Sequence, residues 1–139
     1  MNQQKRHQLA AILAIVLGLL SLKEGGGVLL GLATGPSVIL PWLVWYNVVV
    51  GFLSVLAGRG MWLTRTWAVK LADTIVTLHG VVLMLLVVLY AFHEPVALTS
   101  VIATLFRTLV WVGIVLLLRW SVGDGMRGEV SSEVEGKQE

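Results

Sequence analysis

Four long apolar segments, separated by short polar stretches, make up most of the chain. They cover residues 9–33, 38–58, 67–92 and 96–120. A helix of about 20 apolar residues crosses the roughly 30 Å hydrocarbon core of a bilayer, so each segment is long enough to span a membrane. Short connections make successive helices antiparallel neighbours. The pattern therefore predicts an all-α fold, a four-transmembrane-helix bundle in up-down-up-down order, over residues 1–120.

The first segment is interrupted by polar residues and glycines, and two interpretations of it are open. A helix from Leu9 to Leu22 would be only about 21 Å long, which is too short to cross the bilayer. A long span to residue 33 would instead place Lys23 and Glu24 inside the membrane. The alternative is a short helix followed by a loop at the outer interface. We expect the long span, because the apolar residues after Gly27 otherwise have no apolar surroundings. A cleaved signal peptide is disfavoured, since no clear small-x-small cleavage motif follows the apolar run.

Composition supports the membrane assignment. Of the 139 residues, 57% are hydrophobic and 13% are charged, and the mean hydropathy is +0.87. Soluble domains are usually about one quarter charged. The chain contains no cysteine, which excludes disulfides, thiolate metal sites and cysteine nucleophiles. Residues 121–139 are rich in Gly, Ser and Glu, and this composition predicts a flexible cytoplasmic tail.

Positive charge is distributed unevenly between the two sides of the predicted bundle. Apart from Arg107 within the fourth segment, Lys23 is the one lysine or arginine expected in the far half. The residues on the other side are Lys5, Arg6, Arg59, Arg65, Lys70, Arg119, Arg127 and Lys137. Loops rich in lysine and arginine usually face the cytoplasm. We therefore expect a multi-pass protein with both termini cytoplasmic.

Each predicted span carries a strongly polar residue near the middle of the membrane, namely Glu24, Asn47, His79 and Arg107. An unpaired charge at that depth costs about 2.5–3.5 kcal/mol on insertion scales, so such groups face protein or water. Shared depth and opposite charge predict that Arg107 pairs with Glu24 inside the bundle, with Asn47 and His79 as candidate hydrogen-bond partners. The four residues form either a ligand-binding site or a structural polar network that fixes the helix register.

Small residues on the helix faces predict close helix contacts. On the second span, Gly51, Ser54 and Gly58 share a face with Asn47, and Gly31 and Gly35 continue a small-x-x-x-small pattern on the first. Asp73 lies nearer the cytoplasmic end of the third span. There we expect it within reach of Lys70 or Arg65.

The sequence carries no motif that predicts a reaction. A nucleotide-binding loop, a nucleophile motif and a zinc-binding helix signature are all missing, so no catalytic residue is assigned and an enzyme is disfavoured. A bis-histidine haem needs two facing histidines, but His79 and His93 lie on or next to one helix and His7 lies near the opposite surface. His93 and Glu94 offer too few ligands for a metal ion. We therefore predict no cofactor and no metal, and no basic block suited to nucleic acid is present.

Several short motifs resemble small four-helix bacterial inner-membrane proteins of uncharacterised function. The residues that carry the resemblance are Lys23-Glu24-Gly25-Gly26-Gly27, Ile39-Leu40-Pro41-Trp42 with Trp45 and Asn47, Gly51-Phe52, Trp67-Ala68, and Phe106-Arg107 through Trp111. The resemblance covers about Leu9 to Trp120. It implies a location in the bacterial inner (plasma) membrane and implies no activity, ligand or catalytic residue.

Two classes of function fit these patterns best. The first is binding or transport of a small polar solute or ion at a polar midplane site, which predicts a water-accessible cavity that reaches the midplane. The alternative is a non-catalytic accessory or structural subunit of a membrane complex. The expected partners are the lipid bilayer and either a second copy in a homodimer or another subunit of a membrane complex.

Overall fold

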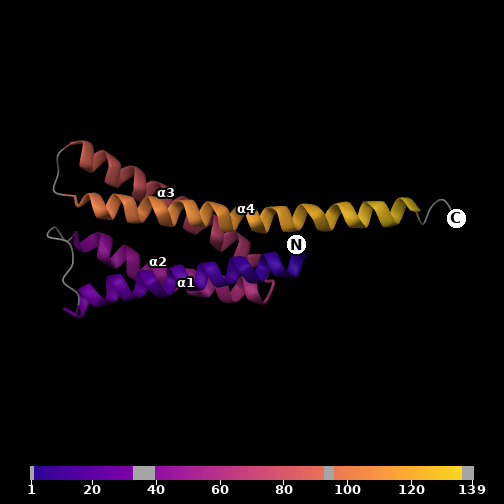
Figure 1. Cartoon of the computed structure of the whole chain (residues 1–139), viewed down its shortest axis with the longest axis horizontal. Coiled ribbons are helices and arrows are strands. Elements are labelled where there is room, and N and C mark those ends of the chain that lie inside the picture. Colours follow the sequence, from indigo (N-terminus) through magenta and orange to yellow (C-terminus); the bar gives the residue numbers. More distant parts are fainter. Residues whose placement is uncertain (1, 33–39, 93–95, 136–139) are drawn as a thin grey trace.

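The computed structural model describes residues 2–32, 40–92 and 96–135, with side chains described as far as Trp120. The described residues form four helices and no strand: α1 (Gln3–Leu29), α2 (Pro41–Trp62), α3 (Thr66–Ala91) and α4 (Leu98–Glu135) (Figure 1). All four are long and apolar enough to cross a membrane. The predicted all-α fold of four candidate membrane-spanning helices is confirmed.

The helices pack in a ring that follows chain order. α1 contacts α2 and α4, and α3 also contacts α2 and α4, while the diagonal pairs make no close backbone contact within the described residues. Consecutive helices run in opposite directions, and the N terminus lies at the end of the bundle from which α4 projects (Figure 1). We call this the basic end, because Arg6, Arg59, Arg65 and Arg119 lie there. The other end, where α1 and α3 finish, is the far end.

The first helix is continuous through Lys23 and Glu24, as the long-span interpretation predicts. It ends at Leu29, however, and not at residue 33, which is outside the described residues. Gly31 has a φ of 66°, and the N–H groups of Gly31 and Leu32 donate to the carbonyls of Val28 (3.1 Å) and Gly27 (2.9 Å). These two bonds form a Schellman cap, which needs a residue in the left-handed region and so favours glycine. Gly31 therefore ends the helix, and an added Cβ there would touch nothing within 4 Å.

The turn between α2 and α3 uses the same cap with an unfavourable residue. Thr64 has a φ of 51°, and the N–H groups of Thr64 and Arg65 donate to the carbonyls of Met61 (3.0 Å) and Gly60 (2.9 Å). A β-branched residue rarely adopts this conformation, because its Cβ crowds the backbone. The cap therefore holds a short, sharp turn at the expense of local strain.

The other helix boundaries differ modestly from the predicted ones. α2 begins at Pro41 and ends at Trp62, later than expected at both ends, because proline suits the first helical position and the Thr64 cap stops the helix. α4 continues past Trp120 to Glu135. A helix that is already formed adds further residues readily, and no proline follows Trp120. The flexible cytoplasmic character of residues 121–139 stays a prediction.

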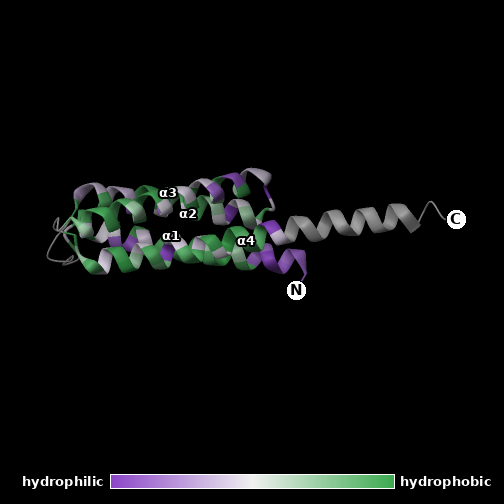
Figure 2. Ribbon diagram, turned by 90° about the horizontal axis from the view of Figure 1, so that it is seen from above, coloured by the Kyte–Doolittle hydropathy of each residue, from purple (hydrophilic) through white to green (hydrophobic). Residues whose placement is uncertain are grey.

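Apolar residues dominate the four helices of the bundle (Figure 2), and many large ones are exposed while many small ones are buried. Exposed large apolar side chains include Leu19, Phe52, Met84 and Leu109. Fully buried small side chains include Ala10, Ala11, Ala14, Ala57, Ala68 and Ala72. A soluble monomer rarely exposes so much apolar surface, whereas lipid-facing helices do so routinely and pack through small residues. The chain is therefore a multi-pass membrane protein.

Candidate functional site

Close packing of α1 against α2 brings two of the predicted site residues to one level. A Cβ added at Gly25 would lie 3.1 Å from the carbonyl oxygen of Val44 and 2.8 Å from Cγ2 of Val48. A real Cβ would clash with both, so only glycine permits this approach of the two backbones. Glu24 and Asn47 are chain neighbours of these contact residues. The glycine contact therefore fixes their relative height in the bundle.

Arg107 of α4 connects three helices. Its Nη2 donates to Oε2 of Glu24 in α1, and its Nη1 donates to Oδ1 of Asn47 in α2 at 3.2 Å. The Arg107 side chain is buried, with 9% of its surface exposed. The pair of Arg107 with Glu24 and the hydrogen bond to Asn47, both inferred above from depth and charge, are present in the structure.

Glu24 does not lie inside the bundle. Its side chain is 59% exposed, although its carboxylate reaches Arg107. The reason is the helix rotation of about 100° per residue, because Gly25 faces α2 and the preceding residue is then turned toward the edge of α1. The site thus has a buried cation and a carboxylate on the outside of the same bundle.

His79 of α3 lies in the same region and is buried, but its hydrogen bond does not go to Arg107. Its Nδ1 donates to the carbonyl of Ile75 at 3.0 Å, since a carbonyl oxygen can only accept. The His79 ring lies between two aromatic rings, with centroids 5.8 Å from Tyr46 and 6.5 Å from Trp111. His79 is therefore part of an aromatic cluster beside the Arg107 pair.

Tyr46 was missed by the sequence analysis. Its hydroxyl is buried and has no hydrogen-bond partner among the described residues. Buried polar groups are nearly always bonded, so an unpartnered hydroxyl calls for an explanation such as a water or a ligand. Its place directly before Asn47 in the same predicted span was the available signal. Other buried hydroxyls are satisfied locally: Ser54 donates to Val50 O at 2.7 Å and Thr104 to Ser100 O at 2.8 Å.

The chemistry of this cluster is that of a hydrogen-bond donor site. A guanidinium has five N–H donors, and the two contacts to Glu24 and Asn47 leave it capacity for further acceptors. The Tyr46 hydroxyl adds another donor at the same level. Among the described residues, no group of three or more His, Asp or Glu side chains is placed to hold a metal ion. His93 and Glu94 lie outside the described residues.

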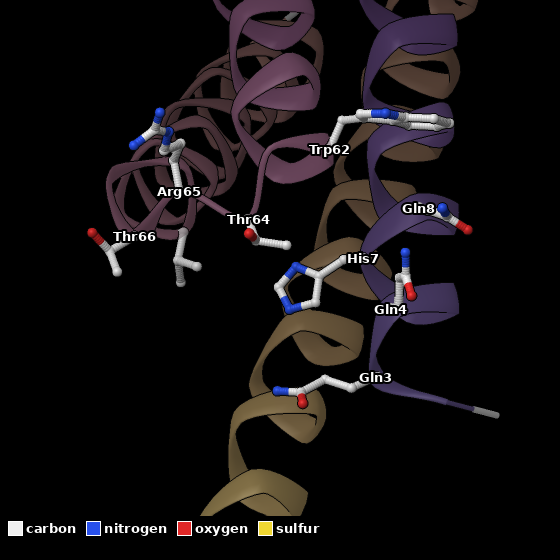
Figure 3. A pocket seen from close by; sticks show the side chains of 9 residues that line it. Gln3, Gln4, His7, Gln8, Trp62, Thr64, Arg65 and Thr66 are labelled. Carbon is white, nitrogen blue, oxygen red and sulfur yellow. The ribbon is translucent and has the colours of Figure 1, made fainter.

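A separate pocket of 610 Å³ opens at the basic end (Figure 3). It is lined by residues from the start of α1 and from the turn between α2 and α3, and Glu24, Asn47, His79 and Arg107 are not among them. It is therefore not the midplane cavity expected from the sequence.

Comparison with known proteins does not assign the chain to a family. No family model, curated protein or solved structure matches the chain. The function has to be argued from the helices and from the side chains that they bring together.

Proposed function

We propose that the bundle binds, and carries across the membrane, a small solute with acceptor oxygens or negative charge, and that Arg107 is its main contact. The observation behind the proposal is the unequal burial of the ion pair: Arg107 is 9% exposed and Glu24 is 59% exposed. We further propose that the basic end faces the cytoplasm of a bacterial inner membrane, because positive charge favours that side.

When both charges of an ion pair are buried, removing either one is costly, because the other is left buried and unpaired. Here the carboxylate stands at the edge of α1, where it can turn away without disturbing the packing of the core. The guanidinium would then need another negative or acceptor group. A solute anion that replaces the Glu24 carboxylate meets this need at the same atoms.

Two neighbouring groups extend the proposed site. The unpartnered Tyr46 hydroxyl can donate to a second acceptor atom of the solute. The His79 ring contacts Tyr46 edge-on and Trp111 in a tilted arrangement, and these rings would form one wall of the site. A solute with one charged end and a small body suits such a mixture of donors and rings.

Binding can be tested with the purified chain in detergent by measuring thermal unfolding in formate, acetate or chloride at constant ionic strength. We expect at least one of these anions to raise the unfolding temperature in a saturable manner. Arg107→Gln should abolish the effect. Arg119→Gln is the matched control, because it removes the same charge from an exposed position on the same helix. Equal anion stabilisation in all three proteins would contradict the proposal.

A role as a subunit of a membrane complex is the second candidate, and two glycines favour it. An added Cβ at Gly80 of α3 or at Gly113 of α4 would meet nothing within 4 Å. Small residues in spans usually permit close helix contact, so a helix of a second copy or of another subunit would find room there. Because the chain has no cysteine, disulfide formation by Gly113→Cys in membranes tests the homodimer directly. Leu20→Cys, exposed on α1, is its control.

A further inference from the structure

The pocket at the basic end has the character of an anion site and is independent of Arg107. Its volume of 610 Å³ falls within the usual range for small-molecule sites, about 300–1,000 Å³. Arg65 contributes a full positive charge, and Gln4 and Gln8 contribute side-chain amides. No acidic side chain is found among the described residues that line it.

Two helices begin at this end, and no described side chain compensates the partial positive charge of their N termini. Neither α1 nor α3 has a side-chain capping bond, and neither has an acidic residue in its first turn. The N-cap position of α3 is Arg65, whose side chain has no acceptor atom, and the neighbouring Thr64 hydroxyl donates to the carbonyl of Leu63 at 2.9 Å. The free N–H groups and the helix dipole make such a terminus favourable for a phosphate or carboxylate.

A buried ring nitrogen adds to this arrangement, and it can donate when its tautomer places the proton there. The ring of His7 extends from α1 into the gap beside Thr64 (Figure 3), and its Nδ1 is buried with no partner among the described residues. Trp62, at the rim of the same pocket, is exposed as interfacial tryptophans are. Arg65, His7 and the start of α3 therefore line one pocket at the basic end of the bundle.

We propose that this pocket binds a phosphate group, held by Arg65, by the first turn of α3 and by His7. Two sources share this chemistry, the phosphodiester of an anionic phospholipid and a soluble phosphate compound. The position of Trp62 at the rim and the open side of the pocket at the bundle end are compatible with both.

The experiment uses the full chain in nanodiscs and measures lipid retention by native mass spectrometry. One set of nanodiscs contains phosphatidylcholine alone, and the other also contains the anionic lipid phosphatidylglycerol. A parallel arm adds inorganic phosphate to the phosphatidylcholine nanodiscs and follows thermal unfolding at constant ionic strength. Retention of phosphatidylglycerol on the chain identifies a lipid source, and saturable stabilisation by phosphate alone identifies a soluble one.

Three variants make the result specific to the pocket. Arg65→Gln should weaken the binding about tenfold, as expected for loss of one charge-assisted hydrogen bond. Thr66→Glu should weaken it at least as much while leaving the chain folded, because an acidic residue in the first turn stabilises α3 but repels phosphate. Arg59→Gln is the control, since Arg59 is exposed at the same end and does not line the pocket. It should leave binding nearly unchanged. Equal weakening by Arg59→Gln and Arg65→Gln, or no saturable binding of either probe, would overturn the proposal.

Discussion

A Cβ added at Gly18 in the α1–α2 pair would lie 2.7 Å from the carbonyl oxygen of Gly51, whereas one added at Gly113 in the α3–α4 pair would meet nothing within 4 Å. The first pair therefore packs backbone against backbone. The second contains larger buried side chains, such as Ile75 and Ile114, and Gly80 and Gly113, the glycines whose surroundings are described, face open space. A glycine in a membrane span can therefore face either the backbone of a neighbouring helix or open space. The rotation of the helix about its axis decides which of the two it faces.

Arg107 lies where these two differently packed halves meet. It belongs to α4, yet both of its hydrogen bonds go to the α1–α2 pair. The α1–α2 pair therefore presents Glu24 and Asn47 at a fixed spacing. The guanidinium that both residues bind comes from α4, in the other pair.

The largest expected effect comes from adding volume in the tight half. Gly18→Val should destabilise the bundle by about 3 kcal/mol, because neither the Gly51 carbonyl nor the Val55 backbone can move aside. Gly113→Val places the same side chain in the open half and should change stability by less than about 0.5 kcal/mol. Unfolding in mixed detergent micelles, followed by circular dichroism, measures both. Similar losses of stability in the two variants would contradict the proposed difference in packing between the α1–α2 and α3–α4 pairs.

The next largest effect concerns the ion pair of Arg107 with Glu24, which connects the two halves. Arg107→Ala should cost about 2 kcal/mol, less than for a fully enclosed pair, because the Glu24 carboxylate left behind is partly exposed. Glu24→Ala should also destabilise. The double variant should lose about 1 kcal/mol less than the sum of the two single losses. Additive losses in this double-mutant cycle would show that the pair contributes no coupling.

The turn between the halves offers a gain in stability. Thr64→Gly should stabilise the protein by about 1 kcal/mol, because glycine adopts the φ of 51° without strain. Thr66→Gly, two residues later at the start of α3, should not stabilise it, since that position is helical. Thermal unfolding of the two variants compares them. A loss of stability in Thr64→Gly would mean that the threonine makes a compensating contact.

The smallest effect concerns the ion pair within the second half. The ion-pair partner of Asp73 is Arg119, which donates to it at 3.1 Å and which the sequence analysis did not name beside Lys70 and Arg65. Both side chains are exposed, and Asp73→Asn should cost less than about 1 kcal/mol. The loss should shrink further at high salt, because salt screens exposed charges. A larger, salt-independent loss would indicate a role beyond the surface.

Much of the fold follows from the sequence because hydropathy and chain length determine which segments can cross a bilayer. The partners of Arg107 also follow, since depth along a span can be counted residue by residue. The rotation of each helix about its own axis, which decides which face points into the bundle, cannot be obtained by counting residues. For that reason the exposure of Glu24 and the aromatic surroundings of His79 were not predicted.

The tight face of α1 was present in the sequence but was passed over. Its small residues recur at spacings of three and four: Ala11, Ala14, Gly18, Ser21 and Gly25. Of the two glycines in the predicted small-x-x-x-small pattern, Gly31 ends the helix and Gly35 lies outside the described residues. The left-handed conformation of Thr64 was beyond prediction, because local preference opposes it and only the short turn imposes it.

The most direct test of the proposed site is the formate affinity of Glu24→Gln, measured by isothermal titration calorimetry in detergent. If a solute anion replaces the Glu24 carboxylate at Arg107, removing that carboxylate should tighten formate binding about tenfold, the size expected when one competing charge is lost. Formate should also restore the stability that Glu24→Gln loses, whereas Arg107→Gln should bind no formate. Weaker formate binding by Glu24→Gln, or unchanged binding by Arg107→Gln, would contradict the account.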